Sequence, residues 1–197
     1  PNNLWRWICF AAIGLSLALG PTARLSAQQR AAPESALRMS DGKTWMTRNL
    51  DLKTDESYCY DNAEANCRRY GRLYSWQAAR RACKAYGKEW RLPTDADWRQ
   101  LAKAYGGVSA DSADRGKAAY KALYANGDSG FQAVLGGGRG EDGKYARGDA
   151  HGFYWTATEI DAGNAWYYNF GKGGLALHRQ DGGEKPGALS VRCVKRP

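Results

Sequence analysis

The stretch Gly187-Ala188-Leu189-Ser190-Val191-Arg192-Cys193-Val194 decides the fold of this chain. Its alternating apolar residues predict a strand in which Leu189, Val191 and Cys193 face one way. Far earlier in the sequence, Cys83 lies in a segment whose apolar residues follow helical spacing. A disulfide between Cys83 and Cys193 would join the two ends of one domain. We therefore expect an exported domain that presents loops, rather than a cytosolic enzyme.

Four cysteines follow the first 27 residues, and an even number in an exported chain favours two disulfides. Three pairings are possible. We favour a local bridge between Cys59 and Cys67 and a long bridge between Cys83 and Cys193. On the chain-entropy model the short bridge contributes about 2–3 kcal/mol of stability and the long bridge about 4–5 kcal/mol.

The N-terminal residues predict export. A basic residue precedes the apolar run 8–19, Gly20-Pro21 ends this run, and Leu25-Ser26-Ala27 suits signal peptidase. The run is short for a membrane span. We therefore expect a signal peptide over residues 1–27, no stable membrane span after its cleavage, and a mobile linker over residues 28–37. An uncleaved anchor is the alternative. The expected location is secreted, periplasmic or on the cell surface.

The chain is basic, with 29 Lys and Arg against 20 Asp and Glu and a formal net charge of +9. The basic residues are scattered over several segments and accompany no nucleic-acid recognition motif. A solvated surface explains most of them. We therefore expect no nucleic-acid partner, while attraction to anionic cell-surface polymers stays possible.

Two main helices are predicted in the first half of the domain. Ser75 can cap a helix that ends at Gly87, as a helix terminator should. Thr94 can cap a second helix, with Asp97 three residues further on. A shorter third helix is predicted at residues 117–124. Each helix carries apolar residues at helical spacing.

The glycine-rich second half predicts sheet and loops. Lys172-Gly173-Gly174 and Asp41-Gly42 are predicted hairpin turns, and residues 136–140 a flexible connection. We expect a single α+β domain over residues 38–197, with two main helices packed on a small twisted antiparallel sheet and a loop-rich C-terminal half. Four strands are predicted in this half, at residues 153–158, 165–170, 175–179 and 189–194.

Catalytic residues are hard to find in this sequence. His151 and His178 stand in no catalytic motif, the serines show no nucleophile elbow, and the cysteine spacings match no zinc pattern. The acidic residues Asp95 and Asp97 serve the start of a helix. We therefore expect no enzyme, no metal and no cofactor.

Aromatic residues are abundant, with 8 Trp and 12 Tyr in the chain. Most should fill the core, because the sequence holds few Phe and Met. Tyr154, Tyr167 and Tyr168 alternate with apolar neighbours, so some of them should lie on the opposite face of the sheet. Flat amphipathic rings on such a face suit sugars or protein partners.

Six segments occur in an order that is known from one protein family. They are residues 41–50 (DGKTWMTRNL), 59–67, 70–76 (YGRLYSW), 90–98 (WRLPTDADW), 154–159 (YWTATE) and 190–194 (SVRCV). With them the chain resembles the Fibrobacter succinogenes major paralogous domain family of exported bacterial proteins. The resemblance implies a C-type-lectin-like fold, related to formylglycine-generating enzymes and to the variable proteins of diversity-generating retroelements. The family itself has no settled activity.

Two activities of the related proteins are not expected here. Calcium-dependent lectins carry a Glu-Pro-Asn or Gln-Pro-Asp loop and a Trp-Asn-Asp strand, which Glu184-Lys185-Pro186-Gly187 and Trp166-Tyr167-Tyr168-Asn169 do not match. Formylglycine-generating enzymes need a reactive, copper-binding cysteine pair, whereas all four cysteines after the signal segment are expected in bridges.

These observations favour a secreted or cell-surface, non-catalytic binding module whose ligand is an unknown extracellular protein or glycan. A receptor diversified by a retroelement is one alternative, although residues 150–190 contain only two Asn, while such variable segments are often Asn-rich. A formylglycine-generating-like oxidase is the other. Ligand contacts are expected on the C-terminal strands and loops, at Tyr154, Thr156, Glu159, Asn164, Trp166, Tyr168, His178, Arg179 and Asp181.

Overall fold

The computed structural model describes residues 35–195, so the predicted signal peptide and residues 28–34 of the predicted linker lie outside the described residues. Strand β1 (Ala36–Arg38) pairs with β2 (Thr44–Met46), which confirms the hairpin around Asp41-Gly42. The prediction of a linker to residue 37 is therefore wrong at its end. A strand added by backbone hydrogen bonds needs no apolar periodicity of its own, so the pattern missed it.

The three predicted helices are confirmed. Ser75 Oγ accepts from the backbone N–H of Ala78 at 3.3 Å, and Thr94 forms a capping box with Asp97. One further helix and a 3-10 turn were not predicted, because they are short and lack an apolar stripe. The helical elements are η1 (Tyr60–Asn62), α1 (Glu64–Tyr70), α2 (Trp76–Tyr86), α3 (Asp95–Ala104) and α4 (Lys117–Leu123).

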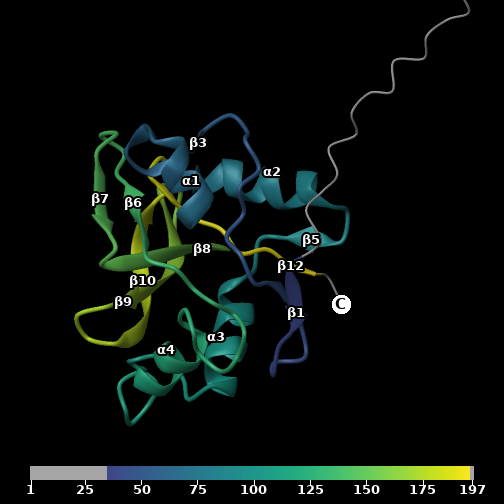
Figure 1. Cartoon of the computed structure of the whole chain (residues 1–197), viewed down its shortest axis with the longest axis vertical. Coiled ribbons are helices and arrows are strands. Elements are labelled where there is room, and N and C mark those ends of the chain that lie inside the picture. Colours follow the sequence, from purple (N-terminus) through teal and green to yellow (C-terminus); the bar gives the residue numbers. More distant parts are fainter. Residues whose placement is uncertain (1–34, 196–197) are drawn as a thin grey trace, which may run out of the picture. The chain divides into compact units, whose positions relative to one another are not determined.

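The strands form two sheets in a mixed α+β fold (Figure 1). The smaller sheet has the order β1-β2-β12-β5, and the larger has the order β10-β9-β8-β6-β11-β4-β3 with β7 paired to β6. The prediction of one small antiparallel sheet is too simple, because β8 pairs in parallel with both β6 and β11. The remaining strands are β3 (Ser57–Tyr58), β4 (Leu73–Ser75), β5 (Trp90–Arg91), β6 (Gly136–Arg139), β7 (Tyr145–Gly148), β8 (His151–Glu159), β9 (Asn164–Gly171), β10 (Ala176–Glu184), β11 (Ala188–Ser190) and β12 (Val194–Lys195).

The predicted strand at 189–194 is divided between the two sheets. Strand β11 pairs with β4 in the larger sheet, and β12 pairs with β2 and β5 in the smaller one. Val191, Arg192 and Cys193 lie between these strands and are all buried. The segment therefore connects the two sheets through the interior of the domain.

Two clusters of buried side chains form the core. The first surrounds Trp98 and includes residues of α3, α4, β8 and β9. The second surrounds Trp76 and includes α2, Trp90 and Trp155. Figure 1 shows α2 and the α3–α4 pair at opposite ends of the larger sheet. The tryptophans Trp45, Trp76, Trp90, Trp98 and Trp155 are all at most 1% exposed.

Both predicted disulfides are present. Cys59 is joined to Cys67, and Cys83 of α2 is joined to Cys193, with a sequence separation of 110 for the long bridge. These four cysteines are all at most 5% exposed. Within residues 35–195, no helix is long and apolar enough to cross a membrane.

Residues 136–140 are a correction to the sequence analysis. The glycine run was predicted as a flexible connection, but Gly136–Arg139 is strand β6 within the larger sheet. A Cβ atom on Gly137 would lie 2.7 Å from Cε2 of Tyr60 and 2.5 Å from the carbonyl oxygen of Ala146. The glycine is needed because a ring and a backbone both pack against this strand.

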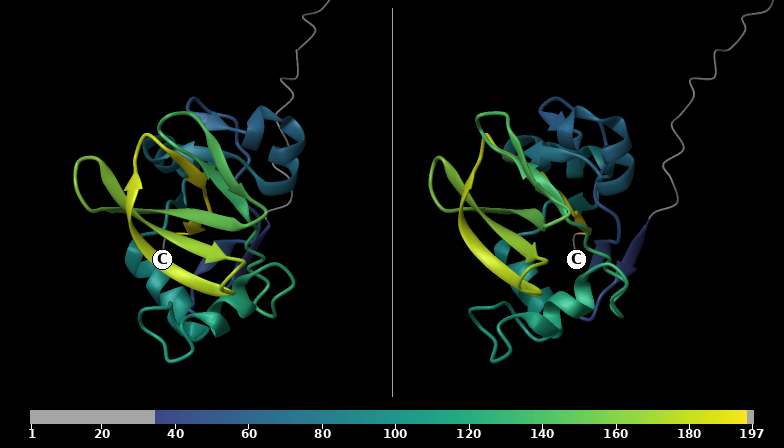
Figure 2. Two further views of the ribbon diagram at one scale, coloured as in Figure 1. Left: turned by 90° about the vertical axis from the view of Figure 1, so that its left-hand side faces the viewer. Right: turned by 60° about the vertical axis from the view of Figure 1, so that its left-hand side comes forward.

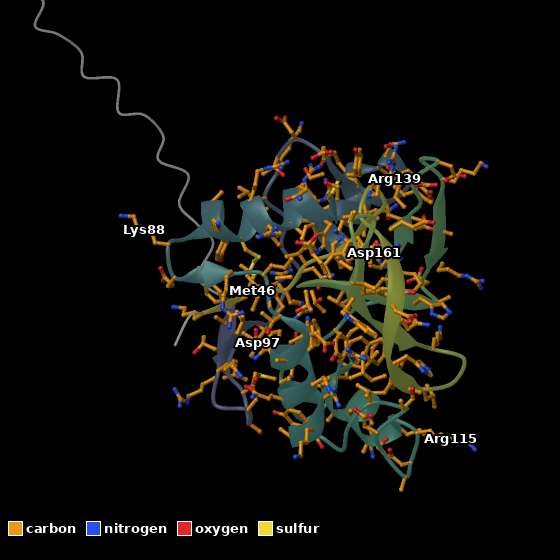
Figure 3. The ribbon with its side chains drawn as sticks, turned by 180° about the vertical axis from the view of Figure 1, so that it is seen from behind. Met46, Lys88, Asp97, Arg115, Arg139 and Asp161 are labelled. Atoms are coloured by element: carbon orange, nitrogen blue, oxygen red, sulfur yellow. A yellow bond between two sulfur atoms is a disulfide. The ribbon has the colours of Figure 1, made fainter. Side chains whose placement is uncertain are left out.

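Three basic side chains lie far from one another on the surface. Lys88 follows α2, Arg115 precedes α4, and Arg139 ends β6, and Figure 3 shows the three at different edges of the domain.

Candidate functional site

Three of the nine predicted ligand contacts are buried. Tyr154, Thr156 and Tyr168 have no exposed surface. The hydroxyl of Tyr154 donates to the carbonyl oxygen of Val134 at 2.9 Å, and that of Tyr168 donates to Asp95 Oδ1 at 3.1 Å. Tyr154 and Tyr168 belong to the Trp98 cluster, and Thr156 is fully buried, so the prediction that these three residues contact a ligand is wrong. The alternation along the strands was recognised, but the inward set of residues was taken for the outward set.

Glu159 and Asn164 brace the turn between β8 and β9. Lys185 Nζ donates to Glu159 Oε2 at 2.6 Å and to the carbonyl oxygen of Asp161 at 2.5 Å, and it lies 4.8 Å from the ring of Trp76. Asn164 Nδ2 donates to Asp161 Oδ1 at 3.0 Å. Oxygens of Glu159 and Asp161 at this turn therefore already accept hydrogen bonds from the Lys185 ammonium group and the Asn164 amide.

Trp166 and Arg179 attach the larger sheet to α3. Arg179 forms a bidentate ion pair with Asp95, with distances of 2.7 Å from Nε to Oδ1 and 2.9 Å from Nη2 to Oδ2. The guanidinium carbon lies 3.3 Å from the ring of Trp166. Both side chains are thus engaged within the fold.

His178 lies on the opposite face of the same strands. We call this face the open face and define it by His151, Phe153, Tyr167, Asn169, His178 and Gln180, which the strand register places side by side on β8, β9 and β10. The left view of Figure 2 shows these strands with no helix in front of them. Asp181, which follows Gln180, is exposed.

A cavity of about 220 Å³ opens next to this face, and we call it the groove. It lies between β6, β7, β8, β9, β10 and β11. Five of its twelve lining residues are glycines, and three are aromatic. The lining consists of Gly138, Arg139, Gly140, Ala146, Phe153, Trp155, Tyr167, Gly182, Gly183, Glu184, Gly187 and Leu189.

Glycines shape the groove because backbone approaches aromatic rings there. A Cβ atom on Gly183 would lie 2.5 Å from Cζ3 of Trp155 and 2.9 Å from Cδ1 of Tyr167. A Cβ atom on Gly138 would lie 3.3 Å from Cδ2 of Phe153. The rings therefore form the floor, and bare backbone forms much of the wall.

Polar side chains lie on the open face next to the rings of Phe153 and Tyr167. His151 Nδ1 lies 2.9 Å from Asn169 Oδ1, and the imidazole stacks on Phe153 with 5.4 Å between ring centroids. Burial and the neighbouring His151 lower the pKa of His178, whose Nδ1 lies 2.8 Å from Ser109 Oγ. Burial and then the charge of Asp181 raise the pKa of Tyr167. Both His178 and Tyr167 are therefore neutral at pH 7.

A second hollow and one group of metal-ligating side chains are weaker candidates for a ligand site. A hollow of about 380 Å³ beside α3 is lined by polar residues such as Arg99, which is already paired with Asp111. Among residues 35–195, one group of three side chains of metal-ligating types has its ligand atoms close together: Cys59, Glu64 and Cys67. The two sulfurs form a disulfide, so no thiolate is available for a metal.

The sequence model of the Fibrobacter succinogenes major domain matches residues 35–195. The chain belongs to this family. No curated protein and no solved structure matches the chain. The match spans all the residues that the structure describes, so this Fibrobacter succinogenes major domain comprises both sheets and both disulfides.

The motif segments of this Fibrobacter succinogenes major domain build its interior. In 154–159, Tyr154 and Trp155 are buried, and Trp155 Nε1 donates to the carbonyl oxygen of Tyr74 at 2.8 Å. In 190–194, every side chain is buried. Phe153 and Tyr167 of the groove lie outside these segments. The motifs thus specify the scaffold and supply Trp155 to the groove, whereas the other lining residues come from positions between them.

Most of the groove was not predicted from the sequence. Tyr167 was noted as a ring that could face outward, but Phe153 and the lining glycines were not proposed as site residues. The available signal was the period of two along residues 151–155 and 165–169. This period shows which residues share a face, but only the strand register shows which face is outward. The register pairs Phe153 with Asn169 and Trp155 with Tyr167.

Proposed function

We propose that this domain is an exported, non-catalytic binding module with a C-type-lectin-like fold, and that its ligand binds at the groove on the open face. One observation carries the proposal: aromatic rings and bare backbone line a cavity beside a sheet face that no helix covers. The ion pairs Arg179–Asp95 and Lys185–Glu159 stabilise the fold and lie outside this cavity.

The absence of a catalytic arrangement among the described residues supports a binding role. Ser109 and His178 form a Ser–His contact, but Nδ1 faces the serine, and no carboxylate among residues 35–195 pairs with the other ring nitrogen. A hydrolytic triad needs such a third group to orient the base. An oxidase would need free thiols, whereas the four cysteines of the described chain form two disulfides.

Export is the second part of the proposal. Disulfides persist in oxidising compartments, and the apolar run at residues 8–19 suits a signal peptide. We expect the protein in the periplasmic or culture fraction, with an N terminus at Gln28 by mass spectrometry. A cytoplasmic protein with reactive thiols contradicts this part.

A variant that fills the groove tests the binding proposal. Ala146 lines the groove and is exposed, so Ala146→Trp adds a ring there without disturbing the core. Lys144→Trp is the matched control, because it adds the same ring beside the same strand, outside the lining residues. The probe is insoluble cell-envelope material sedimented with the full-length protein.

We expect the wild type and Lys144→Trp to sediment with the envelope material equally well, and Ala146→Trp to bind roughly tenfold more weakly. Thermal unfolding checks that all three proteins are folded. Equal binding by Ala146→Trp contradicts the site, and no binding by the wild type to any envelope fraction contradicts the function.

A further inference from the structure

The chemistry of the groove narrows the class of ligand. Its volume of about 220 Å³ is below the roughly 300–1,000 Å³ typical of pockets for drug-sized molecules. A single six-membered ring with its substituents is therefore a better match than a long side chain or a peptide. The T-shaped pair of Phe153 and Tyr167, with 6.0 Å between centroids, provides an apolar floor for such a ring.

Two neutral polar groups beside the groove have free hydrogen-bonding capacity within the described residues. Gln180 pairs with Tyr167 across the strands, and its buried Oε1 has no hydrogen-bond partner among the described residues. The hydroxyl of Tyr167 likewise makes no hydrogen bond within residues 35–195. A buried amide oxygen without a partner is unfavourable, and a ligand hydroxyl that reached it beside the lining residue Tyr167 would relieve this.

The lining of the groove has no excess of positive or negative charge. Arg139 and Glu184 are the charged residues in the lining, and they carry opposite signs. The Arg139 guanidinium lies 4.2 Å over the ring of Tyr58, on a strand that lines no part of the groove. A strongly anionic or cationic ligand would find no matching cluster here.

The rest of the surface does not suggest a protein partner. The large hydrophobic side chains that are exposed in the described chain are Leu37, Ile160 and Leu175. They lie before β2, in the β8–β9 turn and in the β9–β10 turn, so they do not belong to one strand or loop. Protein-docking surfaces usually show a contiguous apolar patch.

We propose that the groove is a calcium-independent subsite for one neutral sugar ring of a polysaccharide. The C–H face of the sugar packs on Phe153 and Tyr167. The hydroxyls of the sugar form hydrogen bonds with Gln180 Oε1, with the Tyr167 hydroxyl and with the backbone of the lining glycines. Amphipathic aromatic rings beside neutral polar groups suit such a ligand. This inference rests on the proposed function and names the ligand class of the same site.

The test uses soluble neutral oligosaccharides of cello-, manno-, xylo- and β-1,3-gluco- type, with oligogalacturonate as the charged comparison. Binding to the full-length protein is followed by calorimetry and by intrinsic fluorescence, with and without EDTA. The variants are Phe153→Ala, Gln180→Ala and Ala146→Trp, with Lys144→Trp as control. In parallel, envelope material is treated with periodate, which cleaves vicinal diols of sugars, or with a protease.

We expect at least one neutral oligosaccharide to bind, unaffected by EDTA, and Phe153→Ala and Ala146→Trp to weaken it roughly tenfold or more. Gln180→Ala, which leaves the rings in place, should weaken it less, and Lys144→Trp not at all. Periodate should abolish envelope binding, and protease should not.

Envelope binding that is sensitive to Ala146→Trp but resistant to periodate, or abolished by protease, overturns the sugar proposal and leaves the binding function standing. The same holds if oligogalacturonate alone binds. If EDTA abolishes oligosaccharide binding, the calcium-independent site is wrong. If neither oligosaccharides nor envelope material bind, both proposals fail.

Discussion

Arg192 is buried deep in the domain, and within residues 35–195 no carboxylate accepts a hydrogen bond from it. It donates to Asn49 Oδ1 at 2.6 Å and to the carbonyl oxygens of Met46, Phe131 and Gln132 at 3.1, 2.5 and 2.6 Å. Burial lowers its pKa to about 10, so the guanidinium stays charged at neutral pH. One side chain therefore ties the segment between the two sheets to two distant loops.

The variant Arg192→Met is expected to lower the free energy of unfolding by about 3 kcal/mol or more, because it leaves buried carbonyl oxygens without donors. Urea denaturation measures the loss. Arg48→Met, at an exposed arginine, is the control and should change stability by less than about 0.5 kcal/mol. Similar stabilities of the two variants would show that water replaces the guanidinium.

Asp97, which belongs to the capping box of α3, should make the stability of the fold depend on pH. Burial alone would raise the pKa of Asp97, but hydrogen bonds from Arg91 and Thr94 outweigh it and lower the pKa to about 2. Arg91 Nη1 lies 2.5 Å from Asp97 Oδ2, and the backbone N–H of Thr94 donates to the same oxygen at 2.7 Å. A carboxyl group with a depressed pKa stabilises the folded state at pH values above its unfolded pKa of about 3.9.

Asp97→Asn is therefore expected to reduce stability by about 2 kcal/mol at pH 7, and the difference from the wild type should shrink as the pH falls from about 4 towards 2. Denaturation curves at pH 7, 5, 3 and 2 measure this. Asp111→Asn removes an exposed ion pair with Arg99 and serves as the control, with little change at any pH. A difference that stays constant over this range contradicts the assignment.

At the scale of elements, the strand β10 depends on glycine where it approaches the groove. Gly183 has no room for a Cβ atom, which would lie 2.5 Å from the ring of Trp155 and 2.7 Å from the carbonyl oxygen of Ala165. Gly173, in the β9–β10 turn, has no atom within 4 Å of an added Cβ. The two glycines therefore form a matched pair for one substitution.

Gly183→Ala is expected to destabilise the protein by about 1–3 kcal/mol through overpacking and to change the near-UV circular dichroism of Trp155. Gly173→Ala should change stability by no more than about 0.5 kcal/mol. Thermal or urea unfolding compares the two. An unchanged stability and spectrum for Gly183→Ala would show that the groove wall yields easily.

Elements differ in how well their sequence predicts them. The helices after Ser75 and Thr94 were predicted because their caps and apolar stripes are local signals. Strand β6 was missed because Gly136–Arg139 has no strand-forming side chains, and its place comes from partners far away in sequence. The division of 189–194 into β11 and β12 was missed for the same reason.

At the scale of the whole molecule, the two disulfides constrain very different lengths of chain. The bridge Cys83–Cys193 closes a loop with a sequence separation of 110, and Cys59–Cys67 closes one with a separation of 8. In the chain-entropy model a longer loop loses more freedom in the unfolded state. The long bridge should therefore dominate the covalent contribution to stability.

The double variant with Cys83→Ala and Cys193→Ala is expected to lose about 4–5 kcal/mol, and the variant with Cys59→Ala and Cys67→Ala about 2–3 kcal/mol. Each removes both sulfurs, so no free thiol is left to confuse the measurement. Urea denaturation under non-reducing conditions compares them. An equal or larger effect of the short bridge contradicts this ranking.

Sequence alone determined the family, the α+β class and the capped helices, because each depends on motifs or on spacings of a few residues. It left three cysteine pairings open, and the folded chain brings together the two favoured pairs. The groove came only from the folded chain. Its floor and walls derive from β6, β7, β8, β9, β10 and β11, and the choice between the inward and outward set of tyrosines depends on strand register. A shift of one residue exchanges the two faces of a strand, and distant partners set the register.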